Sequence, residues 1–184
     1  MKRYYIIIYV LTFVGFISCK KQPTNQPPVE ENELITTVKF TFVDSLTSDT
    51  LRFKWTQPGG PGTLITADTI ELITDRIYLV SVTIFDESKT PIFNVSDEIK
   101  KLQNEHRFFY TSTTSRMLTQ IIDFDTQNPP MELGLRFRAI TSANGTVTGN
   151  FRALLRHYTA SSPKTGGAMA GTADIDVILP LRVQ

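Results

Sequence analysis

The chain has 184 residues, of which 41% are hydrophobic and 20% charged, and its formal net charge is +1. This length suits one domain with a buried core, and the composition is that of a globular protein. A single cysteine excludes an intrachain disulfide framework and a cysteine-rich zinc module. The nearly balanced charge provides no basic surface of the kind that binds nucleic acid, so we expect no nucleic-acid partner.

The N-terminal segment has the pattern of a secretory signal. Lys2 and Arg3 precede Tyr4–Ile17, a run without charged residues. This run is shorter than the ~20 residues that a membrane-spanning helix requires. A basic start followed by a short apolar core is typical of a signal peptide. The only cysteine of the chain, Cys19, follows this core after Ser18.

The sequence Gly15-Phe16-Ile17-Ser18-Cys19 resembles a bacterial lipobox, with Phe16 where leucine is more usual. The resemblance implies cleavage before Cys19, lipidation of that cysteine with chains such as palmitate, and anchoring of the mature N-terminus in a membrane. Several acyl chains, at ~0.8 kcal/mol per buried CH₂ group, anchor a protein stably where one chain does not. A plain secretory signal with a chance cysteine is the alternative.

The segment after the cysteine is predicted to be a spacer. Residues 22–32 are polar, contain three prolines and show no hydrophobic period, which is typical of an extended, disordered tether. The chain is therefore predicted to consist of a signal peptide over 1–18, a lipid-anchored tether over 19–33 and a folded domain over 34–184.

From Leu34 onward apolar and polar residues alternate with a period of two. The pattern recurs in the following stretches: 34–42, 50–56, 78–84, 132–139, 150–156 and 172–183. Such alternation indicates strands with one solvated face. The Pro/Gly-rich residues 57–63 predict a hairpin loop, and Asn144-Gly145 predicts a second hairpin that joins strands near 133–140 and 147–156. Residues 161–171 are predicted to form a glycine-rich loop.

One segment, residues 94–106, breaks the strand pattern. Val95, Ile99 and Leu102 follow helical spacing, and Asn94 or Ser96 provides an N-cap. We predict an all-β fold, a two-sheet antiparallel Ig-like β-sandwich with one short bridging helix. A small barrel is the alternative, because both architectures bury one face of each strand.

The two histidines, His106 and His157, are candidate metal ligands. Two imidazoles and a carboxylate such as Glu105 would suit Zn²⁺. Asp174 and Asp176 add carboxylates at positions i and i+2 of one strand, roughly 7 Å apart. The sequence fixes no distance between the histidines. The favoured interpretation is that each histidine forms a hydrogen bond with a backbone group. We therefore assign no metal and no cofactor.

A second pair of carboxylates, Asp123 and Asp125, has the same spacing. Such pairs occur in glycosidases and in Ca²⁺ sites. The favoured interpretation is a solvated strand face on which carboxylates pair with arginines of neighbouring strands, such as Arg136, Arg138 and Arg152. The chain has no nucleophile elbow, no phosphate-binding loop and no His-Glu-x-x-His motif. We therefore assign no catalytic residue and favour a non-enzymatic protein.

Three motifs, together with the lipobox and the tether, resemble a group of small Bacteroidota lipoproteins over about Glu33–Gln184. The motifs are Glu105-His106-x-Phe108-Phe109-Tyr110, Leu155-Arg156-His157 and Thr172-Ala-Asp174-Ile-Asp176-Val. The resemblance implies a lipoprotein of the outer membrane and no particular activity. Lys20 and Lys21 differ from the acidic residues that often signal surface display in this phylum, so we expect the anchored protein to face the periplasm.

The combined prediction is a lipid-anchored envelope protein that acts as a binding or structural module of unknown ligand. Its expected partners are the membrane, through the anchor, and an envelope protein or glycan. The alternatives are an envelope hydrolase or a metal-binding protein that uses the surface aspartates or the histidines named above.

Overall fold

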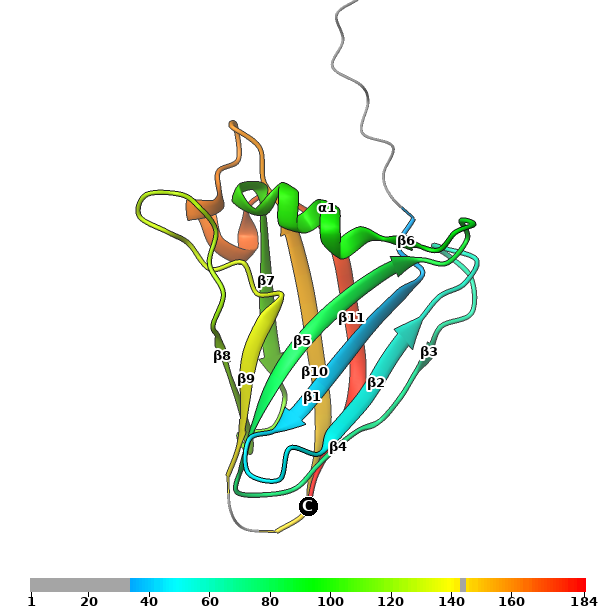
Figure 1. Cartoon of the computed structure of the whole chain (residues 1–184), viewed down its shortest axis with the longest axis vertical. Coiled ribbons are helices and arrows are strands. Elements are labelled where there is room, and N and C mark those ends of the chain that lie inside the picture. The colour runs from blue at the N-terminus through cyan, green and yellow to red at the C-terminus, as the bar shows by residue number, and fades with distance from the viewer. Residues whose placement is uncertain (1–33, 143–144) are drawn as a thin grey trace, which may run out of the picture. The chain divides into compact units, whose positions relative to one another are not determined.

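The computed structural model describes residues 34–142 and 145–184, which form a two-sheet β-sandwich with few helices (Figure 1). The all-β sandwich predicted from the sequence is thereby confirmed. The predicted signal peptide, the lipidated Cys19 and the tether lie outside the described residues.

The helices and strands follow one another in this order: β1 (Thr37–Asp44), β2 (Thr50–Thr56), β3 (Thr66–Ala67), β4 (Ile70–Leu72), β5 (Arg76–Asp86), β6 (Phe93–Asn94), α1 (Val95–Lys101), the 3₁₀ turn η1 (Gln103–Glu105), β7 (His106–Ser112), β8 (Met117–Ile121), β9 (Arg136–Thr141), β10 (Val147–His157), the 3₁₀ segment η2 (Lys164–Met169) and β11 (Thr172–Val183).

The strands are divided between two sheets. The first has the order β3-β2-β1-β5-β9-β8, with β6 also paired to β5, and the second has the order β4-β11-β10-β7. One pair of neighbouring strands is parallel, that of β4 with β11, and the other pairs are antiparallel. The antiparallel prediction therefore holds for all of these pairs but that one.

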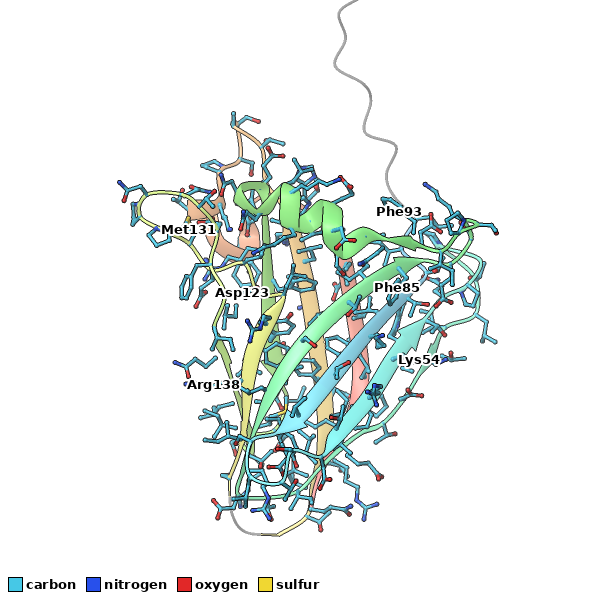
Figure 2. The ribbon with its side chains drawn as sticks, in the orientation of Figure 1. Lys54, Phe85, Phe93, Asp123, Met131 and Arg138 are labelled. Atoms are coloured by element: carbon cyan, nitrogen blue, oxygen red, sulfur yellow. The ribbon has the colours of Figure 1, made fainter. Side chains whose placement is uncertain are left out.

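The core lies between the two sheets and is built from the alternating faces of their strands. Val38, Phe40 and Phe42 of β1 are fully buried, whereas Lys54 of β2 and Arg138 of β9 are exposed on the outer face of the first sheet (Figure 2). Aromatic rings join the sheets, and the ring of Phe40 meets that of Phe151 edge-on at 5.6 Å. Burial of these rings supplies the main driving force for folding.

The helix α1 closes one end of the sandwich (Figure 1). Asn94 is its N-cap, and its side chain accepts a hydrogen bond from the Ser96 amide at 3.2 Å. Val95 and Ile99 are buried, and the Ser96 hydroxyl accepts a 2.7 Å hydrogen bond from the Ile84 amide of β5. The predicted bridging helix is confirmed, although it ends at Lys101 and η1 continues the connection to β7.

Two local predictions require correction. β9 and β10 belong to different sheets, so the predicted hairpin between these two strands is wrong. The buried faces of the strands dictate their pairing and override the local turn signal. The segment 161–171 is also not a simple loop, because η2 lies within it. In the described part of the chain, no helix has the length and hydropathy required to span a membrane.

Candidate functional site: a histidine and carboxylate cluster

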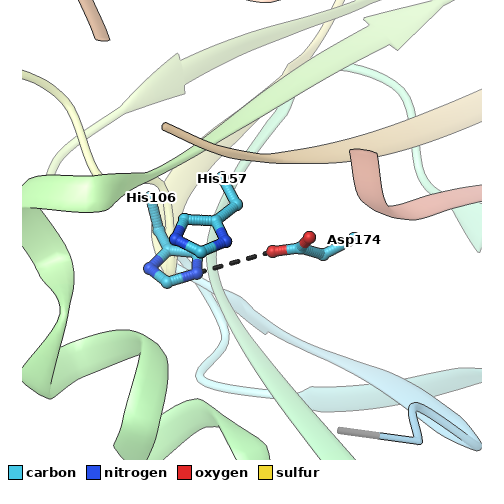
Figure 3. A group of neighbouring side chains, drawn as sticks. All are labelled: His106, His157 and Asp174. Carbon is cyan, nitrogen blue, oxygen red and sulfur yellow. Dashed lines mark ion pairs between the residues drawn. The ribbon is translucent and has the colours of Figure 1, made fainter. Parts of the chain in front are cut away.

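The structure brings the two histidines into contact. His106 begins β7 and lies directly opposite His157, the last residue of β10, in the ladder between these strands. The Tyr158 amide donates a 2.7 Å ladder bond to the Glu105 carbonyl. This bond makes His106 and His157 a non-hydrogen-bonded pair, the kind in which opposed side chains lie closest. The rings stack with centroids 4.7 Å apart and planes inclined by 15° (Figure 3).

The backbone fixes the orientation of His106. Its Nδ1 lies 3.0 Å from the Leu102 carbonyl oxygen, which can only accept a hydrogen bond, so Nδ1 carries a proton. In the neutral imidazole Nε2 then carries no proton and presents a lone pair. This atom lies 3.5 Å from Oδ2 of Asp174. Two facing acceptors repel each other unless a proton or another cation lies between them.

A β-bulge brings Asp174 to this position. The register between β10 and β11 shifts at Leu155/Arg156, and Leu155 pairs with Ile175 whereas Arg156 pairs with Ala173. Asp174 therefore has no directly opposed residue in β10. Bulges of this kind change the direction of a side chain and occur frequently beside binding sites. The sequence contains no signal that places the bulge.

Glu105 adds a second carboxylate to the cluster. Its Oε2 lies 3.4 Å from Nε2 of His157, and its backbone is fixed by the ladder bond from Tyr158. The side chains of His157 and Glu105 are 23% and 49% exposed, whereas that of His106 is 8% exposed. The cluster thus has a buried side at His106 and a solvent-accessible side at His157 and Glu105.

The electrostatics of the cluster favour a cation. Burial by itself lowers the pKa of His106, but the hydrogen bonds to Asp174 and to the Leu102 carbonyl, together with the negative charges of Asp174 and Glu105, outweigh burial and raise the pKa above its usual value. The imidazole therefore experiences a negative potential. Such a potential attracts a proton or a metal ion to Nε2.

Asp176 does not belong to the cluster, although it lies two residues from Asp174. Its carboxylate accepts two hydrogen bonds from Arg152 of β10, at 2.6 and 2.7 Å. The bonds from Arg152 lower the pKa of Asp176. The interpretation of a cross-strand arginine partner holds for Asp176, but the two aspartates do not act as a pair.

The other predicted pair of carboxylates is divided as well. Asp125 is buried, and its Oδ2 accepts a 2.7 Å hydrogen bond from Nζ of Lys164, whereas its Oδ1 accepts bonds from the Gln127 and Met131 amides at 3.1 and 2.8 Å. Asp123 accepts a 2.9 Å bond from the Gly134 amide and lies, like Met131, near the end of the sandwich closed by α1 (Figure 2). Each aspartate thus has its own structural partner.

The buried ion pair between Lys164 and Asp125 was not predicted from the sequence. Their side chains are 2% and 0% exposed, and Lys164 also donates to the Gln103 carbonyl at 3.0 Å. Burial lowers the pKa of Lys164 despite the opposing effect of Asp125. The pair connects η2 to the loop after β8, and a lysine in a small-residue segment gives no sequence signal of burial.

A groove of about 430 Å³ follows β7 and β8, and residues including Phe109, Gln120, Glu132 and Leu154 line it. Its charged groups are compensated, because Glu132 bonds Arg107 and the lining residue Arg152 bonds Asp176. Arg107 also covers the ring of Phe109, with its guanidinium carbon 4.8 Å from the ring centroid. The groove therefore offers a mixed surface without an unsatisfied charge.

Comparison with known proteins adds no further assignment: the chain matches no protein-family model, no curated protein and no solved structure. Function is therefore inferred from the geometry of the residues that the structure describes. Among the candidate side chains, His106, His157 and Asp174 present one ligand atom each within 4.8 Å of one another. Such a cluster can hold a proton, donate hydrogen bonds to a polar ligand or coordinate a metal.

Proposed function

We propose that this protein is a lipid-anchored binding module of the bacterial cell envelope that holds its ligand at the cluster of His106, His157 and Asp174. The observation that carries the proposal is the convergence of these side chains from β7, β10 and β11 at one end of the sandwich. Convergent polar side chains are the groups that fix the orientation of a ligand in binding sites.

The anchor is supported by the sequence. A short apolar core followed by the only cysteine, Cys19, matches a lipoprotein signal. Such an anchor attaches the sandwich to a membrane, and we infer the outer membrane with the sandwich facing the periplasm. A module held in that position would have an envelope protein or a glycan as its partner.

The separate partners of Asp123, Asp125 and Asp176 favour a binding role over a hydrolase. A glycosidase requires two carboxyl groups about 5–9.5 Å apart on either side of a substrate bond. Asp125 and Asp176 are held by Lys164 and Arg152, and Asp123 is bonded to the backbone. These contacts do not pair any two of the three aspartates across a common space.

A thermal-shift screen of the full chain tests the binding role. Divalent metals, sugars, short peptides and nucleotides are added in turn to the wild type and to His157→Gln, whose substitution removes one exposed member of the cluster. We expect at least one class to raise the melting temperature of the wild type but not that of the variant. The proposal fails if every class shifts both proteins equally or shifts neither.

A further inference from the structure

We propose that His106, His157 and Asp174, with Glu105 as a fourth ligand, form a site for a divalent transition metal of the zinc class. The proposal rests on the proposed function, because it names the ligand of the same cluster. The four side chains combine two imidazole nitrogens with two carboxylates, a donor set that Zn²⁺ accepts in proteins.

The distances between neighbouring donors suit a tetrahedral ion. Two atoms bound to one Zn²⁺ by ~2.0–2.1 Å bonds lie ~3.4 Å apart at a tetrahedral angle. Nε2 of His106 lies 3.5 Å from Oδ2 of Asp174, and Nε2 of His157 lies 3.4 Å from Oε2 of Glu105. Both pairs thus have the spacing of ligands that share one ion.

The two pairs must still approach each other, and Glu105, whose carboxylate contacts His157, must move together with that residue. Ligand atoms of His106, His157 and Asp174 lie up to 4.8 Å apart, and atoms bound to one Zn²⁺ are separated by at most ~4.2 Å. The stacked rings also direct their nitrogens along similar lines. A small rotation of the His157 side chain, which is 23% exposed, would bring its Nε2 towards the shared ion.

His106 is already oriented as metal-bound histidines are. Its Nδ1 proton is held by the Leu102 carbonyl at 3.0 Å, so that Nε2 is the free donor. A backbone carbonyl in this role fixes the tautomer and the ring direction in metal sites generally. The facing acceptors Nε2 and Oδ2, which repel each other when nothing lies between them, both become ligands once the ion is bound.

Charge and donor type select the class of metal. The carboxylates of Asp174 and Glu105 balance the charge of a divalent ion when both imidazoles are neutral. Ca²⁺ and Mg²⁺ favour sites built wholly from oxygen ligands, whereas two imidazoles favour zinc and its transition-metal neighbours. Because the ligands come from η1, β7, β10 and β11, the ion also connects segments that are distant in sequence and stabilises their arrangement.

The test is a zinc titration of the full chain, purified from membranes in mild detergent and stripped with a chelator. We expect one Zn²⁺ per chain by calorimetry, a raised melting temperature, and Co²⁺ absorption of tetrahedral intensity. His157→Gln and Asp174→Asn should each weaken zinc binding about tenfold or more, since each removes a ligand. Excess Ca²⁺ should not compete.

Asp176→Asn is the matched control, because Asp176 lies on the same strand but is bonded to Arg152. This variant should bind zinc as the wild type does. Circular dichroism confirms that each variant is folded, and His157→Gln, at a partly exposed position, keeps the test valid if Asp174→Asn unfolds. The proposal is overturned if zinc does not bind the wild type, or if it binds His157→Gln as tightly as the wild type.

Failure of this proposal is distinguishable from failure of the proposed function. If zinc does not bind but another class of compound stabilises the wild type and not His157→Gln, the binding role stands and the metal assignment is wrong. If no class acts through the cluster, both are wrong.

Discussion

Oδ2 of Asp174 lies 3.5 Å from Nε2 of His106 because a bulge in β11 directs the Asp174 side chain towards the start of β7. Asp176, two residues further along the strand, bonds Arg152 instead. One irregularity in the ladder therefore separates a carboxylate of the candidate site from a carboxylate of the sheet surface.

The pKa of His106 should depend on Asp174. In the metal-free wild type we expect this pKa to lie above the usual value of about 6.5, since hydrogen bonds and negative charge outweigh burial. Asp174→Asn removes the charged partner, so burial should then dominate and lower the pKa. Titration of the imidazole by NMR in the presence of a chelator measures both values. An unchanged pKa in the variant would contradict the assigned contact.

The stability of the metal-free protein should depend on pH through the same pair. A histidine whose pKa is raised in the folded state adds stability that is fully present below its unfolded pKa and is lost as pH rises through its folded pKa. Asp174→Asn should therefore destabilise the protein more at about pH 5.5 than at about pH 9. Urea unfolding of both proteins at the two pH values measures the difference, and equal losses would count against the ion pair.

The affinity for zinc should change with pH in the opposite direction. A metal ion must displace the proton from His106, so its binding weakens as the pH falls below the raised pKa of this residue. Zinc titrations over a range of pH, with the Asp176→Asn variant in parallel, measure the effect. Affinity independent of pH would mean that His106 is not a ligand.

The buried pair of Lys164 and Asp125 should contribute strongly to folding. Lys164→Met leaves the Asp125 carboxylate buried without its cation, and removal of one partner of a buried ion pair costs about 3–5 kcal/mol. Adding Asp125→Asn should recover part of this loss, because the amide oxygen still accepts the bonds from Gln127 and Met131. The free energy of unfolding in urea measures both variants.

A surface ion pair provides the control for that comparison. Arg152→Gln breaks the ion pair between Arg152 and Asp176, whose side chains are 45% and 46% exposed. Because exposed ion pairs contribute only about 0–1 kcal/mol, this variant should lose little stability. If Asp125→Asn recovered none of the stability lost in Lys164→Met, the unpaired Asp125 carboxylate would not be the source of that loss.

The aromatic core should be sensitive to truncation. The Phe137 side chain is fully buried between the sheets, with its ring 4.2 Å from that of Tyr110. Phe137→Ala should therefore cost about 3–5 kcal/mol through lost burial and a new cavity. Leu118→Ala is the control, because Leu118 is 64% exposed, and it should change stability by no more than about 0.5 kcal/mol. Equal effects would contradict the assigned strand faces.

The anchor has its own experiment. Cys19→Ala removes the only cysteine of the chain and should move the protein from the membrane fraction to the soluble fraction, because the acyl chains provide the attachment. Labelled palmitate should enter the wild type but not the variant. Unchanged membrane partitioning would show that Cys19 is not the point of attachment.

Sequence alone determined the class of fold, because strand alternation and helix capping are local properties. The buried positions of β1 and β11 follow the period-two pattern of their residues, and Asn94 caps α1 as expected from its residue type. The partners of each strand were beyond local pattern. Asn144-Gly145 resembles a hairpin turn, yet β9 and β10 pair with other strands whose faces complete the core.

Only the tertiary structure determined the composition of the candidate site. The sequence supplied His106, His157 and Asp174 as separate candidates, and the register of β7 against β10 made the histidines neighbours. The bulge then selected Asp174 and excluded Asp176. Residue type states what a side chain can bind, whereas long-range pairing, governed by the packing of the whole core, decides which side chains meet.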